Sequence, residues 1–267
     1  MSDKLLFSHN NSFTPGNRIK LLSYNVQVGM GTSRPHHYVT KSWKHVLPHA
    51  AHFNNLDQIA ELVKGYDIVG LQEVDAGSIR SSYVNQTAYL AEKAEFAFWQ
   101  HQTNRNLGHF AKHSNGLLCQ YPLQHIEQHK LPGRLPGRGA MIAFFGAPEN
   151  PLVVVLLHLA LGKKARQQQL LYISNIVSAY EHVVLMGDLN CQPESEEMLS
   201  LLQSTDLRAP VADLLTFPSW KPSRMLDHIL VSPSLRVHDV SVVDVAISDH
   251  LPISMDVTIP GAVGLAA

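Results

Sequence analysis

The sequence has few of the features that indicate a membrane protein or a secreted disulfide scaffold. Its longest apolar stretch, residues 152–161, is too short to cross a bilayer and contains His158. Only two cysteines occur, Cys119 and Cys191, and a single pair does not indicate a disulfide framework. Residues 1–16 are polar and lack the apolar stretch of a secretory signal. We therefore expect a cytoplasmic protein without an integral membrane segment.

Charge is also scarce, at 16% of the residues against the usual share of about a quarter. The 21 Lys and Arg residues nearly balance the 22 Asp and Glu residues, so no overall positive field recruits nucleic acid or an anionic membrane nonspecifically. A local basic cleft would not show in that sum, and a nuclease is therefore weakened but not excluded. Hydrophobic residues make up 45% of the 267 positions, which predicts a globular protein, and the length fits one α/β domain.

Apolar runs of strand length recur along the chain and predict buried strands. They cover residues 19–24, 67–72, 116–121, 140–145, 152–159, 183–187, 226–231, 237–245 and 253–259. Helical periodicity from Leu56 to Val63, with Asn54 or Asn55 as N-cap, predicts one helix, and residues 163–180 and 194–203 predict two more. Because strands outnumber helices and several follow one another directly, we expect mixed sheets with helices on their outer faces.

Two stretches stand apart from these elements. Residues 27–53 are long for a connection and include three histidines at near-helical spacing, His45, His49 and His52. Pro48 interrupts that helix, so a surface or substrate-covering loop is favoured over a second metal site. We divide the chain into an N-terminal extension over residues 1–17, one domain over 18–259, and a small, apolar, flexible C-terminal tail over 260–267.

Polar side chains interrupt or end the apolar runs at separate places along the chain. They are Asn25, Glu73, His158, the pair Asp188 and Asn190, and the pair Asp249 and His250. Because open α/β sheets place ligand sites beyond the carboxyl ends of their strands, we expect these side chains to converge. Asn, Glu and Asp oxygens, with remaining positions for water, suit Mg²⁺ or Mn²⁺, whereas zinc would favour more Cys or His.

Each of these signals also has an ordinary structural explanation. Asn25 could end a strand, Glu73 could be a solvated carboxylate, and His158 could be a hydrogen-bonded core histidine. Asp188 and Asn190 follow a buried run two positions apart, so in an extended chain both would face the same way. An Asx turn leading into the next helix is the alternative for that pair.

The run Ser248-Asp249-His250 superficially offers the side chains of a serine hydrolase. Successive residues of an extended chain point to opposite faces and rarely form a triad. We therefore reject the serine-hydrolase interpretation.

Six motifs in order carry a family resemblance. They are Ser23-Tyr24-Asn25-Val26, Leu71-Gln72-Glu73-Val74, His158, Gly187-Asp188-Leu189-Asn190, Leu226-Asp227-His228-Ile229-Leu230-Val231-Ser232 and Ser248-Asp249-His250-Leu251-Pro252. Over about residues 18–258 the chain resembles the endonuclease/exonuclease/phosphatase superfamily. The resemblance implies an α/β fold, a four-layer αββα sandwich with two mixed β-sheets packed face to face. It also implies that residues 18–259 form a catalytic domain that hydrolyses phosphate esters by direct attack of activated water.

The resemblance implies a metal centre as well. Glu73 would be the principal ligand of Mg²⁺ or Mn²⁺, with Asn25 and Asp249 as direct or water-mediated ligands. Two further residues are candidate substrate contacts. Arg138 could contact a phosphate, with a solvated loop arginine as the alternative, and Trp220 could stack on a base, with a hydrophobic lid as the alternative.

The remaining matched residues would act on the phosphate and the water. Asp188 and Asn190 would orient both groups, and His158 would bind a phosphate oxygen. His250, oriented by Asp227, would act as general base or as electrostatic stabiliser.

The resemblance leaves the substrate open. Asp75 stands two residues after Glu73, where the apurinic endonuclease branch usually has Lys, so that branch is disfavoured. We expect a phosphodiesterase, with nucleic acid slightly favoured over a phospholipid head group. A phosphomonoesterase of a small metabolite is the alternative, a non-catalytic binding protein is disfavoured, and no obligate protein partner is inferred. Arg80, Arg105 and Lys163 are solvated loop cations as readily as phosphate contacts.

Overall fold

The computed structural model describes residues 15–29, 50–134, 136–210 and 214–265. Its strands are β1 (Pro15–Asn25), β2 (Ile68–Asp75), β3 (Phe98–Asn106), β4 (Lys112–Cys119), β5 (Leu123–Lys130), β6 (Gly139–Phe145), β7 (Leu152–His158), β8 (His182–Asp188), β9 (Asp227–Val231), β10 (Arg236–Val242) and β11 (Ile253–Pro260). Its α-helices are α2 (Ala50–Val63), α3 (Gln86–Lys93), α4 (Lys163–Val177) and α5 (Glu196–Ser204). Three 3-10 turns, η1 (Gln27–Gly29), η3 (Ile79–Ser81) and η4 (Gly261–Val263), complete the described elements.

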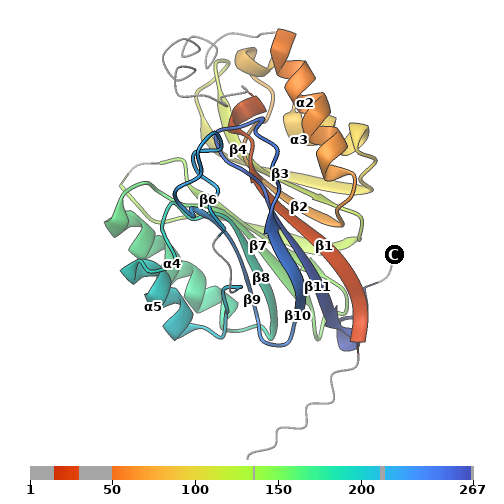
Figure 1. The fold of residues 1–267 in the computed structure, drawn as a ribbon, viewed down its shortest axis with the longest axis vertical. Coiled ribbons are helices and arrows are strands. Elements are labelled where there is room, and N and C mark those ends of the chain that lie inside the picture. The colour runs from red at the N-terminus through yellow and green to blue at the C-terminus, as the bar shows by residue number, and fades with distance from the viewer. Residues whose placement is uncertain (1–14, 30–49, 135, 211–213, 266–267) are drawn as a thin grey trace, which may run out of the picture.

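The strands form two mixed sheets. One has six strands in the order β10-β11-β1-β2-β4-β3, and the other has five in the order β5-β6-β7-β8-β9. The pairs β1–β2 and β7–β8 are parallel, and the other neighbours are antiparallel. Helices α2 and α3 lie outside the six-stranded sheet and α4 and α5 outside the five-stranded sheet (Figure 1). The predicted four-layer αββα sandwich is confirmed.

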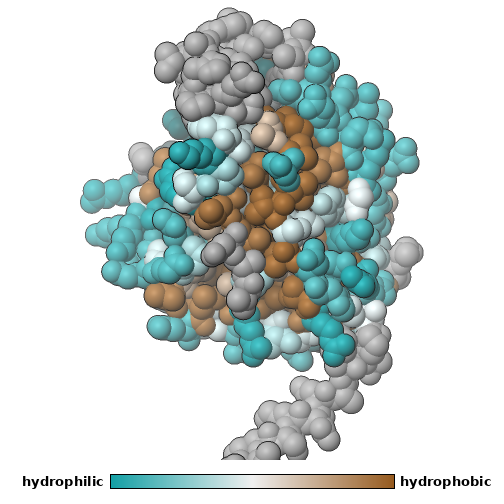
Figure 2. Space-filling view, viewed as in Figure 1, coloured by the Kyte–Doolittle hydropathy of each residue, from teal (hydrophilic) through white to brown (hydrophobic). Residues whose placement is uncertain are grey.

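The alternation of strand side chains explains the layers. Along β1, Ile19 and Leu21 belong to the core between the two sheets, whereas Leu22 and Tyr24 belong to the core beneath α2 and α3. Neighbouring strand residues point to opposite faces, so a strand covered on both sides needs apolar residues at successive positions. Hydrophilic side chains cover the helix-bearing flanks, and hydrophobic ones gather along the middle of the visible face (Figure 2).

The two sheets approach each other closely at Gly70, a glycine of β2. A Cβ atom at Gly70 would lie 2.7 Å from Cδ1 of Leu156 and 2.9 Å from Cε of Met186, both from the opposite sheet. Since ordinary carbon atoms do not pack at such distances, the missing side chain at Gly70 allows this approach.

The structure differs from the sequence prediction at several elements. Strands β3 and β5 and helix α3 were not predicted, and α2 begins at Ala50, before the predicted Asn54 or Asn55 cap. Helix α5 is capped by Ser195, whose hydroxyl accepts a hydrogen bond from the amide of Met198 at 3.3 Å. Residues 261–263, placed in a loose tail by sequence, form η4, and Val263 is fully buried.

Two further predictions concern the histidine-rich loop and membrane-spanning segments. The histidine-rich loop with its possible second metal site falls mainly on residues 30–49, outside the described residues. Among the described residues, no helix combines the length and apolar character needed to span a membrane.

Candidate active site

Five of the predicted residues lie where strands of the two sheets begin or end. Asn25 ends β1, and Glu73 lies two residues before the end of β2, its parallel neighbour. His158 and Asp188 end β7 and β8 at paired positions. Asp227 begins the antiparallel strand β9 opposite Asp188. Parallel pairing therefore brings these side chains to one end of the sandwich, as the sequence predicted.

Glu73 has an unusual backbone conformation within its strand. Its φ angle is 58°, and the pairing of β2 with β4 shifts register between Leu71 and Val74. Such a bulge re-aims a side chain, and a left-handed backbone at a non-glycine residue is concentrated at functional sites. The bulge brings Oε1 of Glu73 to 3.8 Å from Nε2 of His158.

Glu73, Asn25 and Asp249 form an oxygen-rich group suited to a hard divalent cation. Burial and the negative charge of Asp249 raise the pKa of Glu73, while His250 opposes that shift. Carboxylates whose charges disfavour each other are stabilised when a cation lies between them. Gln27 donates from Nε2 to Oδ2 of Asp249 at 3.2 Å. The donor set therefore fits Mg²⁺ or Mn²⁺.

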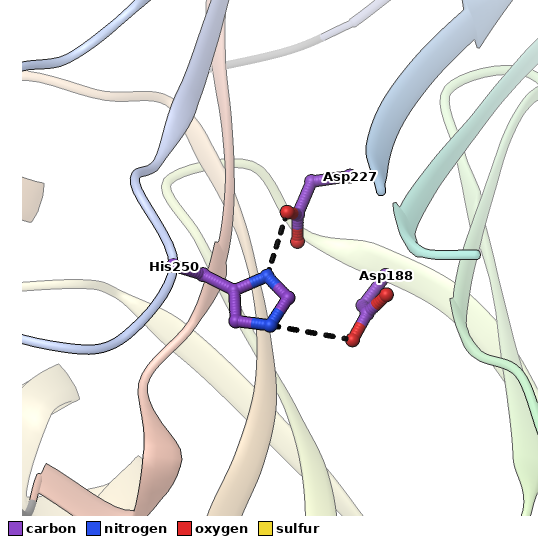
Figure 3. A group of neighbouring side chains, drawn as sticks. All are labelled: Asp188, Asp227 and His250. Carbon is purple, nitrogen blue, oxygen red and sulfur yellow. Dashed lines mark hydrogen bonds and ion pairs between the residues drawn. The ribbon is translucent and has the colours of Figure 1, made fainter. Parts of the chain in front are cut away.

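Asp188, Asp227 and His250 form a second cluster, in which one ligand atom from each lies within 4.8 Å of the others (Figure 3). Nδ1 of His250 lies 2.7 Å from Oδ2 of Asp227, and its Nε2 lies 3.9 Å from Oδ2 of Asp188. Thr216 donates its hydroxyl to the same Asp227 oxygen at 2.5 Å. The short bond at Nδ1 makes this cluster an oriented imidazole between two carboxylates more readily than a metal centre.

The charges in this cluster shift the pKa values in opposite ways. Burial alone would lower the pKa of His250, but Asp227 and Asp188 outweigh it and raise the pKa to about 10. Burial raises the pKa of Asp188 to about 7, although the His250 charge opposes the shift. Burial, followed by the charge of Arg138, lowers the pKa of His158 well below its usual value. At neutral pH the site thus holds one charged and one neutral imidazole.

The strand that carries Asp188 ends there rather than continuing to Asn190. Oδ1 of Asp188 accepts a hydrogen bond from the amide of Asn190 at 2.9 Å, and Asn190 has a φ angle of 51°. This is the Asx turn that stood as the alternative, so the extended, same-face arrangement is wrong. Asn190 instead donates its amide to the carbonyl of Leu159 at 3.0 Å, which ties it to the end of β7.

Ser248 organises the loop that carries Asp249 and His250. Its hydroxyl donates to the carbonyl of Asn25 at 2.6 Å, and its carbonyl accepts from the hydroxyl of Ser219 at 2.6 Å. Its amide donates to the hydroxyl of Tyr24 at 3.2 Å. Ser248 is fully buried, so the rejection of a serine nucleophile agrees with its position.

Phe217 is an aromatic neighbour of the site. The Phe217 ring lies 4.8 Å from the His250 ring, centroid to centroid. Trp220 is half-buried and is not among the described residues that line the adjoining cavity. The sequence analysis missed Phe217, Thr216 and Gln27, since only their tertiary neighbours show what they support.

A cavity of about 810 Å³ opens beside Glu73 and His158. Arg138 lines it, and its positive charge lowers the pKa of Glu73, after the larger effects of burial and other neighbours. His113, also missed from sequence, lines the cavity too. Burial and the charge of Arg80 lower the pKa of His113 to about 4, so it faces the cavity as a neutral ring.

Arg80 and Asp75 form a buried ion pair behind His113. Nε of Arg80 lies 2.5 Å from Oδ2 of Asp75, and the two side chains are 4% and 0% exposed. Nη1 of Arg80 lies 3.5 Å from Nε2 of His113. Arg80 is therefore not a solvated loop arginine, which was one of the two alternatives that the sequence left open. Lys163, by contrast, is an exposed cation that pairs with Glu196 at 2.9 Å.

The αββα sandwich and its site of carboxylates, amides and imidazoles define the class of phosphoester hydrolases. Residues 22–250 match the Endonuclease/Exonuclease/phosphatase family, and the chain belongs to that family. Members of the family hydrolyse phosphoesters. No curated protein matches the chain.

Solved structures share the fold at low sequence identity. An endonuclease/exonuclease/phosphatase from Beutenbergia cavernae is 19% identical with a TM-score of 0.72, covering 92% of this chain and 73% of its own. A mannosyl-6-phosphatase from Bacteroides thetaiotaomicron is 16% identical with a TM-score of 0.67, covering 90% and 99%. Sphingomyelinase C from Streptomyces griseocarneus is 18% identical with a TM-score of 0.63, covering 90% and 99%. At these identities the similarity concerns the fold alone.

Proposed function

We propose that the protein is a phosphodiesterase that depends on Mg²⁺ or Mn²⁺ and hydrolyses its substrate by direct attack of water. The observation that carries the proposal is the oriented imidazole of His250, held by Asp227 and facing Asp188. Nε2 of His158 lies 3.6 Å from Oδ2 of Asp188, and Glu73 and His158 line the adjoining cavity. A phosphate held there would meet a base, two imidazoles and a cation site together.

Glu73, Asp249 and Asn25 would hold the divalent ion. When bound, the ion would supply Lewis-acid polarisation of a phosphoryl oxygen and lower the pKa of a coordinated water. Asn25 also donates from Nδ2 to Oδ2 of Asp188 at 3.1 Å, so the same residue would link the cation site to the base.

The other side chains would divide the work on the reacting phosphate. Asp188 would accept the proton of the attacking water. His250, kept charged and oriented by Asp227, would stabilise the negative charge that develops on the phosphate oxygens. His158, whose Nε2 lies 3.6 Å from Oδ2 of Asp188, would donate a hydrogen bond to a phosphate oxygen. Asn190 would help to position the phosphate from the end of β8.

Nucleic acid is favoured over a phospholipid head group because the cavity beside the site is rich in cations, including Arg138. A phosphomonoesterase of a small metabolite is the second candidate, and the structural similarity to a mannosyl-6-phosphatase favours it. We also propose a cytoplasmic location, which is supported by the free, buried Cys119 and Cys191.

The test combines three substitutions with a substrate panel. Glu73→Gln, Asp188→Asn and His250→Ala should each reduce turnover by orders of magnitude while circular dichroism shows folded protein. A chelator should abolish activity, and added Mg²⁺ or Mn²⁺ should restore it. Single-stranded DNA, duplex DNA, RNA, phospholipids and phosphorylated sugars separate the candidate substrates. Near-normal turnover in all three variants, or in the presence of chelator, would sink the proposal.

A further inference from the structure

The cavity beside the catalytic residues has a strongly one-sided charge. Four cationic side chains line it, Arg105, Arg134, Arg138 and Lys164. Glu73 is the one acidic side chain among its described lining residues. The net charge of the whole chain is −1, so this local excess of positive charge is a property of the cavity and not of the composition.

Among the described residues these cations make no ion pair, although the charges of Glu73 and Asp188 act on Arg138. Within the described part of the chain, no salt bridge joins Arg105, Arg134, Arg138 or Lys164 to a carboxylate. The other cations near Lys164 on α4 are paired with carboxylates: Lys163 pairs with Glu196 at 2.9 Å and Arg166 with Glu197 at 2.7 Å. Clustered, unpaired cations repel one another, and an anionic ligand would relieve that repulsion.

Arg105 is seated by a glycine that no other residue replaces easily. A Cβ atom at Gly137 would lie 3.1 Å from Cβ and 3.3 Å from Cδ of Arg105, and Gly137 has a φ angle of +109°. An L side chain would be strained at that angle, and it would press against the arginine stem. Arg105 and Arg138 line the same cavity. Burial lowers the pKa of Arg138, Glu73 and Asp188 oppose that shift, and the charge of Arg105 adds to it.

Helix α4 adds to the positive potential. Its N-cap residue is Gly162, which provides no side chain to accept hydrogen bonds from the first turn. Gly162, Lys164 and Ala165 line the cavity. The amide of Ala165 donates to the carbonyl of Gly162 at 3.0 Å, so the amides of Lys163 and Lys164 at the start of the helix are the ones that would favour an anion beside the cationic side chains.

We propose that this cavity binds a second phosphate group of the substrate, next to the phosphate that is hydrolysed. The proposal rests on the phosphoesterase function proposed above and narrows its substrate class to molecules with at least two phosphates. Arg105 and Lys164 are the contacts that determine specificity for the second phosphate. Arg138 contributes to this subsite and to the site of hydrolysis, because its charge also acts on Glu73. The second phosphate belongs either to the next nucleotide of a strand or to a small molecule that carries two phosphates.

Paired substrates that differ only in the second phosphate test this subsite. The first pair is thymidine 5′-(p-nitrophenyl phosphate) and its 3′-phosphorylated form, and the second is glucose 6-phosphate and glucose 1,6-bisphosphate. The proteins are wild type, Arg105→Gln, Lys164→Gln and the double variant. Lys163→Gln is the matched control, because Lys163 neighbours Lys164 but does not line the cavity.

The wild type should prefer the doubly phosphorylated member of at least one pair. The double variant should lose about 10- to 100-fold in kcat/KM for that member, as expected for charge-assisted hydrogen bonds, and little for its partner. Lys163→Gln should keep the preference. Preference within the nucleotide pair assigns the phosphate to a strand, and preference within the sugar pair assigns it to a small molecule.

Calorimetry separates this proposal from the proposed function. Thymidine 3′,5′-bisphosphate should bind more tightly than thymidine 5′-monophosphate to the wild type, and equally to the double variant. If the wild type binds the bisphosphate more tightly than the monophosphate but hydrolyses no substrate, the proposed function is overturned and the subsite is supported. Equal affinity for both nucleotides together with no preference within the sugar pair would overturn the subsite, and so would an equal loss in the double variant for both members of the preferred pair.

Discussion

Replacing Asp75 with alanine removes the common acceptor of several buried donors. Asp75 is fully buried, and its two carboxylate oxygens accept hydrogen bonds from backbone and side chain alike. The donors are the amide of Gly77 at 2.9 Å, the hydroxyl of Ser78 at 2.8 Å, Nε of Arg80 at 2.5 Å, the hydroxyl of Ser81 at 3.0 Å and the amide of Lys112 at 3.1 Å. The substitution therefore leaves a buried guanidinium and several buried dipoles without their acceptor.

The expected loss is about 3–5 kcal/mol in the free energy of unfolding, the range for removing one partner of a buried ion pair. Proteins of this kind have net stabilities of roughly 5–15 kcal/mol, so Asp75→Ala should fold but unfold at much lower urea concentration. The double variant Asp75→Asn/Arg80→Met leaves no orphaned charge, and it should lose less than Asp75→Ala.

The pH dependence gives this prediction a sign. Burial alone would raise the pKa of Asp75, but Arg80 and the amide of Lys112 outweigh it and lower the pKa below its usual value. A carboxylate with a lowered folded-state pKa contributes its stability above the unfolded pKa of about 3.9 and loses it as pH falls through the folded value. The gap between wild type and Asp75→Ala should therefore be largest near pH 7 and narrow below about pH 4.

Urea unfolding followed by tryptophan fluorescence measures the gap at each pH. Glu196→Gln, which removes the exposed partner of Lys163, is the control and should leave the midpoint unchanged. A midpoint of Asp75→Ala equal to wild type, or a double variant less stable than Asp75→Ala, would refute the reasoning.

Three further predictions concern separate parts of the fold. Thr216→Val removes the hydroxyl that donates to Asp227 at 2.5 Å. If Asp227 orients His250 as proposed, kcat should fall about tenfold or more with KM little changed, and an unchanged kcat would contradict this role. Burial raises the pKa of Cys119 to about 12 and of Cys191 to about 11, so Ellman's reagent should label neither thiol before denaturation; fast labelling of the native protein would show otherwise. Gly70→Ala should lower the free energy of unfolding in urea by about 1 kcal/mol, because the atoms it meets are tips of flexible side chains. Gly65→Ala, with open space around it, should lower it less, and equal effects would argue against the close approach.

Mixed sheets with outer helices could be predicted from the apolar runs because the central strands are buried on both faces, whereas the four-layer sandwich was implied by the family resemblance. Strand β7 is buried at every position and is apolar from Leu152 to Leu157, before His158. Strands β3 and β5 lie at sheet edges and carry mostly polar residues, so hydrophobic runs do not reveal them. Helix α3 is short, and its Asn85 cap, which accepts from the amides of Thr87 and Ala88, was the one local signal available.

The candidate site divides in a similar way. Glu73, His158 and Asp188 were found because each interrupts or ends an apolar strand. Thr216 and His113 come from segments without that contrast, and their importance depends on neighbours distant in sequence. The turn at Asn190 shows the limit of strand geometry, since an Asx hydrogen bond ended the strand where periodicity would have extended it.

The hydrogen bond from Asn25 to Asp188 joins the end of one sheet to the end of the other. The candidate site thus takes its residues from both sheets, and the distance between the sheets is set by the core in which Gly70 lies. Turnover should therefore depend on the relative position of the two sheets. Heating, or a substitution in the hydrophobic core between the sheets and far from the substrate, should abolish activity while both sheets and their helices are still folded.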